Sequence, residues 1–381
     1  MTGPTAKLAH ENELESPESA TRRCVAGAGI LALRWAFFSI GAMRVGMTRA
    51  WLVAAIAAAL AGAAAASAAS LPALQPVVLP RDHGAHPAFQ VEWWYTAGTV
   101  ADRRSRDFFW FATAWSGEGF VLAKLNVVDL RADRIVLSRE YVAAGALASG
   151  QTRMDVDGFV LGWQPRGTLG RWAVDAPVPG SGRLRLSLTP VQPYVLNGSH
   201  GIVQEGPGAA SAYYSDPRLA ARGTLVLDGQ PSRVSGQGWF DHQWGNFATN
   251  SASWHWNWFA CQFQDGSDLM LYQFITPAGR PTGVQSGTFV SSHGVATHPQ
   301  RFTVVPLRPA IRPPSATGSY PLRWRLEVPS ARVNVTLKAR ARHQFISNQY
   351  LPGFWEGAAA ITSGAPGACI VESTRETAST F

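Results

Sequence analysis

From Leu71 onward the chain consists of short runs of β-branched and aromatic residues, bounded by Gly, Pro, Asp and Asn. Runs of this kind, without apolar positions at helical spacing, predict β-strands joined by turns. We expect strands at residues 91–100, 107–116, 120–129, 182–189, 221–228, 254–264, 268–276, 321–328 and 332–338. Many short strands without a repeat of fixed period are typical of an all-β protein built from sandwiches or barrels.

The N-terminal part has a different pattern. Residues 47–69 begin with Met-Thr-Arg, continue with an apolar, alanine-rich run and end in small residues, which is the pattern of a secretory signal peptide. We interpret residues 1–46 as an extra or mis-assigned extension and expect the mature protein to be exported to the periplasm. If translation starts at Met1, two alternatives stay open: a membrane anchor made of the apolar runs, or a twin-arginine export signal at residues 21–23.

The remaining chain is expected to hold two domains. A length of 381 residues with 46% hydrophobic residues allows each domain to bury a core. We place an N-terminal domain at 70–248, a C-terminal domain at 249–362 and an atypical tail at 363–381, which a frameshift would explain. Cys261 and Cys369 remain after export, and the sequence leaves open whether they pair.

The basic residues do not form a surface for nucleic acid. The formal net charge is +8, but lysine occurs only at Lys7, Lys124 and Lys338, and the arginines are scattered singly or in pairs. A nucleic-acid interface needs basic residues clustered along one face. We therefore expect no nucleic-acid partner.

Two aromatic motifs concentrate the unusual chemistry near the boundary between the expected domains. Along an extended strand, successive side chains point to opposite faces. In the first motif, one face carries Phe240, His242 and Trp244, and the other carries Trp239, Asp241 and Gln243. In the second motif, one face carries Trp254, Trp256 and Trp258, and the other carries His255, Asn257 and Phe259.

A third aromatic run, Glu92-Trp93-Trp94-Tyr95-Thr96, contains a carboxylate among residues that favour burial. A buried carboxylate must be paired, hydrogen-bonded or protonated. Two interpretations stay open for Glu92 and Asp241: they hold backbone or indole N–H groups in place, or one of them is a general acid in an apolar cavity. His242 and His255 have the same ambiguity between a structural and a catalytic role.

Motifs for metal or cofactor chemistry are absent from the sequence. It contains no HExxH, paired CxxC, P-loop, dinucleotide fingerprint or GxSxG elbow. The segment 82–86 offers Asp and His side chains, but no matching second cluster accompanies it, so we expect no metal site. Cofactor-free chemistry or the binding of a ligand is what the residues favour.

Several motifs occur together in one order along the chain: His86, Glu92–Tyr95, Gly98, Ala212–Ser215, Pro217–Leu219, Gly223–Leu225, Trp239–Gly245 and Asp268–Tyr272. In this respect the chain, from about residue 83 to Gly357, resembles the carotenoid 1,2-hydratase (hydroxyneurosporene synthase) family, which overlaps the AttH-like, lipocalin-like proteins. The resemblance implies two lipocalin-like β-barrel domains packed together, with no metal or organic cofactor. It also implies an apolar carotenoid, isoprenoid or lipid as partner, with peripheral contact to a membrane as an option.

The resemblance further implies a reaction in which a carboxylic acid protonates a terminal C=C, aromatic faces stabilise the cation, and water captures it. The expected catalytic residues are Asp241, His242, Trp244 and Asn257. The expected substrate-binding residues are Glu92, Trp94, Tyr95, Tyr214, Trp254, His255, Trp256 and Trp258.

At one position the chain departs from the family. Many relatives have Trp-Asp-Trp where this chain has Trp256-Asn257-Trp258, and an asparagine cannot donate a proton as a carboxylic acid can. Two functions therefore stay open. The protein is either a hydratase with Asp241 as acid and His242 as its orienting partner, or an exported carrier that binds an apolar ligand without turnover.

Overall fold

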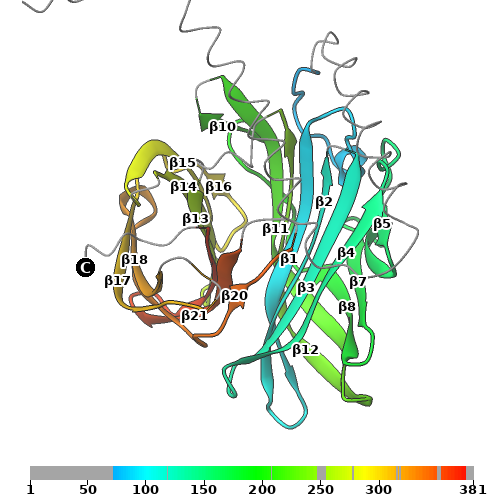
Figure 1. Cartoon of the computed structure of the whole chain (residues 1–381). Helices are drawn as coiled ribbons and strands as arrows, with labels where there is room; N and C mark the ends of the chain where they lie inside the picture. The colour runs from blue at the N-terminus through cyan, green and yellow to red at the C-terminus, as the bar shows by residue number, and fades with distance from the viewer. Residues whose placement is uncertain are drawn as a thin grey trace, which may run out of the picture. The chain divides into compact units, whose positions relative to one another are not determined.

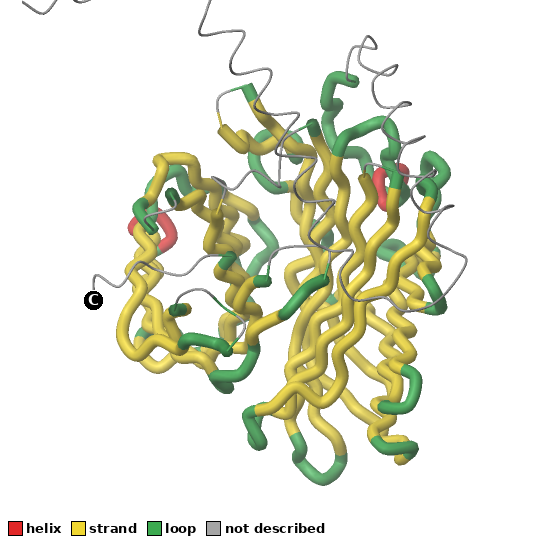
Figure 2. Tube along the Cα trace, in the orientation of Figure 1, coloured by secondary structure: helices red, strands yellow, loops and turns green. Residues whose placement is uncertain are grey.

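The computed structural model describes residues 72–117, 119–206, 208–246, 255–276, 279–314, 316, 319–349 and 353–374. The expected signal peptide and the extension before it lie outside these residues. In the described part, helix is confined to two short 3-10 turns, η2 (Arg81–His83) and η3 (Pro329–Ala331), and strands make up most of the trace (Figure 2). No helix found there is long and apolar enough to cross a membrane. The all-β prediction is confirmed.

The first sheet contains twelve antiparallel strands. Its order is β4-β3-β2-β1-β12-β11-β8-β7-β6-β5, and the short strands β9 and β10 both pair with β11 (Figure 1). The bounds are β1 (Val91–Asp102), β2 (Asp107–Gly117), β3 (Phe120–Asp129), β4 (Arg134–Ala144), β5 (Arg153–Val156), β6 (Phe159–Gln164), β7 (Arg171–Val178), β8 (Gly182–Pro190), β9 (Val195–Leu196), β10 (Ile202–Gly206), β11 (Ala209–Leu227) and β12 (Gln230–Gly245).

This sheet curls until its two ends meet. The Tyr141 hydroxyl on β4 donates a hydrogen bond to the Pro177 carbonyl on β7, over 2.7 Å. The curl encloses a core of large aromatic side chains, in which Trp172 and Phe240 stack with ring centroids 3.9 Å apart. Burial of such side chains is the main favourable contribution to the stability of the sheet.

The second sheet contains ten antiparallel strands. Its order is β16-β15-β14-β13-β22-β21-β19-β18-β17, and β20 pairs with β21. The bounds are β13 (His255–Phe263), β14 (Asp268–Ile275), β15 (Pro281–Val290), β16 (Ala296–Thr297), β17 (Thr303–Ile311), β18 (Tyr320–Val328), β19 (Val333–Ala339), β20 (Phe345–Ile346), β21 (Phe354–Ser363) and β22 (Gly367–Ser373). It encloses its own core, around Trp324 and Trp355.

A third core lies between the two sheets. Tyr95, Phe111 and Trp239 of the first sheet pack there with Trp258 and Phe354 of the second. The two sheets resemble curled, nearly closed barrels, and each presents an apolar outer face to the other. The predicted pair of packed lipocalin-like barrels is confirmed.

A buried ion pair also connects the two sheets. β11 contains a register shift between Asp216 and Leu219, and Arg218 lies inside it. The Arg218 guanidinium donates to the Asp268 carboxylate on β14 over 2.7 Å and to the carbonyl oxygens of Phe263 and Ser267. The register shift thus turns one basic side chain of the first sheet toward the second.

The second sheet extends beyond its expected end at residue 362. β22, within the segment expected to be an atypical tail, lies between β13 and β21 in the middle of the sheet. A disulfide joins Cys261 on β13 to Cys369 on β22, which answers the question that the sequence left open. The expected domain boundary at 248 falls in the stretch 247–254, outside the described residues.

The disulfide leads to a stability prediction. Replacing Cys261 and Cys369 together by alanine should lower the free energy of unfolding by about 2–4 kcal/mol, because the bond closes a long loop in the unfolded chain. Denaturant titration of both proteins measures this difference. Wild-type protein treated with dithiothreitol should fall to the stability of the double variant; free thiols at these positions in the untreated native protein would contradict the assignment.

Candidate functional site

β12 carries the central motif, and its side chains alternate between two buried faces. Phe240 and Trp244 belong to the core inside the first sheet, whereas Trp239 belongs to the core between the sheets. Asp241 and His242 therefore point to opposite sides of the sheet. Two groups of polar residues form, one on each side of β12.

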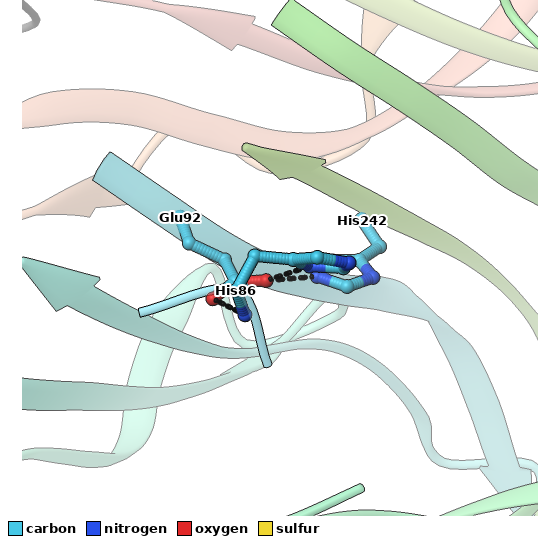
Figure 3. Close-up of side chains that lie close together, drawn as sticks. All are labelled: His86, Glu92 and His242. Atoms are coloured by element: carbon cyan, nitrogen blue, oxygen red, sulfur yellow. Dashed lines mark hydrogen bonds and ion pairs between the residues drawn. The ribbon is translucent and has the colours of Figure 1, made fainter. Parts of the chain in front are cut away.

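The first group is a histidine–carboxylate cluster made of His86, Glu92 and His242, with Asp82 beside it. Figure 3 shows the two imidazole rings converging on the Glu92 carboxylate. Glu92 Oε1 lies 2.7 Å from His86 Nδ1 and 2.8 Å from His242 Nε2. The backbone N–H of His86 donates to Glu92 Oε2 over 2.8 Å. One carboxylate thus holds two histidines that are far apart in the sequence.

Two tryptophan side chains stack on the imidazole rings of the cluster and hold them in place. Trp244 stacks on His86 at a centroid distance of 3.9 Å, and Trp94 stacks on His242 at 4.6 Å. Glu92 and His242 are buried, and His86 is partly exposed. A small cavity of about 50 Å³ adjoins the cluster and is lined by His86, Glu92 and Ser116, among others.

The charges in this cluster compensate one another. Burial would lower the pKa of His86, but its interactions with Asp82 and Glu92 outweigh burial and raise it. Burial would raise the pKa of Glu92, but hydrogen bonds to His242 and His86 outweigh burial and lower it. These interactions therefore favour the ionised form of Glu92 and the protonated form of His86.

Tyr214 lies on the same side of β12 but contacts a different histidine. Its hydroxyl is 2.8 Å from His83 Nδ1, and His83 stacks on Trp163. Burial lowers the pKa of His83 to about 3, so this ring is neutral. Tyr214 and His83 form a hydrogen-bonded aromatic wall of the first core.

The second group is an acid pair between the sheets, made of Glu356 on β21 and Glu372 on β22. The two residues are direct neighbours across the strands, so their carboxyl groups lie on the same face of the sheet and influence each other's pKa. Glu356 Oε1 accepts a hydrogen bond from the Tyr95 hydroxyl over 2.7 Å, and Glu372 accepts one from Trp256 Nε1. Glu356 Oε2 is buried and accepts no hydrogen bond from any described donor.

The surroundings of this acid pair raise the pKa of both carboxyl groups. Burial is the largest cause that raises the pKa of Glu356, and the neighbouring charge of Glu372 raises it further. Burial likewise raises the pKa of Glu372 to about 7, and the charge of Asp241 adds to this effect. Neither carboxyl group has an ion-pair partner among the described residues, so a shared proton is the remaining way to neutralise the pair.

Asp241 faces the same inter-sheet space but is fully hydrogen-bonded. Its Oδ1 accepts from the Ser215 hydroxyl and Trp239 Nε1, and its Oδ2 accepts from the Tyr213 hydroxyl, all within 2.7 Å. Burial raises the pKa of Asp241 to about 6, although these three donors oppose the rise. The arrangement corresponds to the structural interpretation of this residue.

Glu205 is a further buried carboxyl group on this side. It accepts hydrogen bonds from the Ser211 hydroxyl over 2.7 Å and from Gln243 Nε2 over 2.6 Å. Burial raises its pKa to about 7. The face of β12 that carries Asp241 and Gln243 therefore lies among carboxyl groups whose pKa values are raised by burial.

The structure separates residues that the sequence analysis grouped. Glu92, Trp94, His242, Trp244 and Tyr214 lie inside the first sheet; Tyr95, Asp241, Trp256 and Trp258 lie between the sheets. The expected pairing of Asp241 with His242 as acid and orienting residue is wrong, because neighbouring side chains of a strand point to opposite faces.

The remaining predicted residues lie on β13 or just before it. Asn257 is buried, and its side-chain oxygen accepts a hydrogen bond from Ser373. His255 is partly buried, and Trp254 lies outside the described residues.

Three residues of these groups were missed as site residues. His86 stands in the segment that was considered for metal ligands, six residues before Glu92. Glu356 stands between Trp355 and Gly357, an aromatic context similar to that of Glu92. Glu372 stands in the segment that we set aside as a tail, and no local signal identifies it.

Fold and site together define a two-barrel, lipocalin-like protein with buried acid and histidine groups. Residues 71–374 match the family model described as AttH-like. The chain therefore belongs to the AttH-like family.

Two solved structures share this fold. A protein of Nitrosomonas europaea described as an AttH has a crystal structure that covers 80% of this chain and 99% of its own, with a TM-score of 0.72 at 23% identity. Kievitone hydratase of Nectria haematococca covers 81% of this chain and 94% of its own, with a TM-score of 0.63 at 16% identity. At these identities the likeness shows a shared fold.

A similarity in sequence is found with the dehydratase asqC of Emericella nidulans. The two chains are 26% identical over 157 residues, which is 39% of this chain and 44% of the dehydratase. The match therefore spans less than half of the curated relative.

The raised pKa of Glu372 leads to a prediction about stability and pH. The folded state keeps a proton that the unfolded chain releases above its ordinary pKa of 4.5, so the stabilising contribution is complete below pH 4.5 and is lost as pH rises to about 7. This interval, at about 1.4 kcal/mol per pH unit, corresponds to about 3 kcal/mol. The variant Glu372→Gln has no carboxyl group to titrate at this position, so its free energy of unfolding should not show this decrease between pH 4.5 and 7.

Denaturant titrations of wild type and Glu372→Gln between pH 4.5 and 7.5 test this. Tyr95, Glu356 and Asp241 surround Glu372 in both proteins, so the difference between the two pH profiles reports the titration of Glu372 together with its effect on the pKa of Glu356. Parallel profiles would show that Glu372 titrates normally.

Proposed function

We propose that the protein is a hydro-lyase that adds water to, or removes water from, a C=C bond of an apolar isoprenoid or polyene such as an acyclic carotenoid, with the Glu356–Glu372 pair as the proton source. The observation that carries this proposal is the cross-strand pairing of Glu356 with Glu372, whose carboxyl groups accept hydrogen bonds from Tyr95 and Trp256. A carboxylic acid that stays protonated at neutral pH in an aromatic environment has the properties that alkene protonation requires.

The Glu356–Glu372 pair can supply and recover every proton that the reaction needs. In hydration, the shared carboxyl proton is transferred to one alkene carbon, and a carbocation forms at the other. A water oxygen bonds to the cation, and the proton that this water loses returns to the carboxylate. Dehydration follows the same steps in reverse: the acid protonates the leaving hydroxyl group, and the carboxylate then takes a proton from the neighbouring carbon.

The surrounding aromatic residues suit a cationic intermediate. Trp258 packs edge-on against Tyr95 and Trp239, and Trp256 is hydrogen-bonded to Glu372 itself. The faces of such rings stabilise a cation by about 2 kcal/mol or more where water is excluded. The substrate chain would lie along this inter-sheet aromatic surface.

Glu372 lies on the face of the second sheet that carries Trp258, opposite to the face that carries Asn257. Glu372 lies directly opposite Trp258 in the pairing of β13 with β22, one residue along β13 from Asn257. Its side chain is only partly buried, as is that of Trp256, whereas Glu356 is buried, so a ligand would approach the pair from the side of Glu372. Asp216, another carboxyl group with a strongly raised pKa, is fully enclosed and suits this role less well.

The names of relatives support the same reaction class. Kievitone hydratase shares the fold, and the dehydratase asqC shares sequence over part of the chain. Both names denote reactions that add or remove water.

Incubation of the purified full-length protein with lycopene in detergent tests the proposal. We expect a product heavier by one water molecule, and we expect Glu356→Gln and Glu372→Gln each to reduce its rate of formation by about 100-fold or more, because general acids contribute factors of this size. Glu327→Gln is the matched control, since Glu327 is a partly exposed carboxylate paired with Arg325 on β18.

Two outcomes would contradict the proposal. Lycopene that co-purifies with the wild type but gains no mass would identify an isoprenoid carrier. A mass gain that persists at the wild-type rate in both glutamine variants would show that the proton comes from another group.

A further inference from the structure

The histidine–carboxylate cluster on the other side of β12 has no part in the proposed reaction, and its geometry requires an explanation. Three potential ligand atoms, His86 Nδ1, His242 Nε2 and one Glu92 oxygen, lie within 4.8 Å of one another. The three side chains come from the loop after η2, from β1 and from β12, and they point toward a common centre (Figure 3). Two histidines and one carboxylate are a frequent ligand set for divalent metal ions.

The nitrogen of His242 that points away from this centre fixes the state of the ring. Nδ1 lies 3.0 Å from the Asp82 backbone carbonyl oxygen, which can only accept a hydrogen bond. Nδ1 must therefore carry a hydrogen, and in a neutral ring Nε2 then presents a lone pair. This lone pair points at Glu92 Oε1 from 2.8 Å, and two lone pairs at that distance require either a proton or a metal ion between them.

His86 repeats this arrangement from the opposite side. Its Nε2 lies 3.5 Å from Asp82 Oδ1, while its Nδ1 lies 2.7 Å from the same oxygen of Glu92. Asp82 itself is held by Arg81 and by the backbone N–H of Val78. In metal sites, the outer nitrogen of a ligating histidine usually donates to a carboxylate or a backbone carbonyl, and Asp82 offers one of each.

The surroundings leave room for one more ligand. Trp244 and Trp94 cover the two imidazole rings, so water reaches the cluster mainly from the cavity lined by His86, Glu92 and Ser116. The volume of about 50 Å³ is enough for one water molecule. Three protein ligands with a water in the fourth position are typical of zinc sites that bind exchangeable ligands.

We propose that His86, Glu92 and His242 bind a divalent transition-metal ion, with Zn²⁺ as the ion that best matches two imidazoles and a carboxylate. The proposal does not rest on the proposed hydro-lyase activity, because Glu356 and Glu372 lie on the other side of the first sheet. It differs from the sequence-based expectation of no metal site, since the second ligand cluster missing near residues 82–86 is supplied by residues from β1 and β12.

Metal titration of the full-length protein, without a polyhistidine tag and after chelator treatment, tests this proposal. We expect one equivalent of Zn²⁺ to bind in competition with a chromogenic chelator, and Co²⁺ to give the visible absorption bands of a four-coordinate site. His86→Ala and Glu92→Gln should each abolish the stoichiometric binding. Asp82→Asn should weaken it by about 10-fold to 100-fold, because Asp82 only orients His86.

Controls separate loss of the site from loss of the fold. His343→Ala removes a histidine that pairs with Asp133 on the surface and should leave the metal binding unchanged. Each variant is checked by its thermal unfolding without metal, and His86 is partly exposed, so its replacement is the mildest change in the cluster.

Two results would overturn the proposal. If the wild type binds no stoichiometric Zn²⁺ or Co²⁺, a proton rather than a metal ion holds the Glu92–His242 contact. If His86→Ala and Glu92→Gln fold and bind the ions as the wild type does, the ions bind elsewhere.

Discussion

The burial of residues 238–245 of β12 on both faces is the constraint on which the rest of the structure depends. A strand usually has one face toward solvent, but here one side of β12 closes the core of the first sheet and the other side meets the second sheet. Each polar side chain on this strand therefore needs partners inside the protein. His242 finds them in Glu92 and the Asp82 backbone, and Asp241 finds them in Ser215, Trp239 and Tyr213.

The buried carboxyl groups differ because their neighbours differ. Glu92 lies between two imidazoles and loses its proton readily; Asp241 accepts three hydrogen bonds; Glu356 has a hydroxyl on one oxygen and another carboxyl group beside the other. These surroundings favour an ionised Glu92 and a protonated Glu356, and they leave both oxygens of Asp241 occupied by hydrogen bonds. Residue type alone does not separate these roles, since all three are acids in aromatic runs of the sequence.

Local pattern was sufficient for the strands but not for the site. The alternation of Trp256 and Trp258 against Phe259 follows from the period of a strand, and the cores confirm it. The partners of Glu92 and Trp256 come from residues 150 and 116 positions away along the chain, and no local pattern reports such pairings. For the same reason β22 was mistaken for a tail: its strand character is visible only once β13 and β21 lie on either side of it.

The histidine–carboxylate cluster and the residues around Asp241 both depend on the pairing register of β12. A shift of β12 by a single residue would move His242 to the inter-sheet face and Asp241 into the first core, and both groups would lose their partners. Gly98 of β1, paired with Gly238 of β12, opposes such a shift: a Cβ atom on Gly98 would lie 2.1 Å from the Gln237 carbonyl oxygen. β1 and β12 can approach closely there only because this position is glycine. Two glycines thus fix the strand that divides the histidine–carboxylate cluster from the acid pair, although neither glycine belongs to a site.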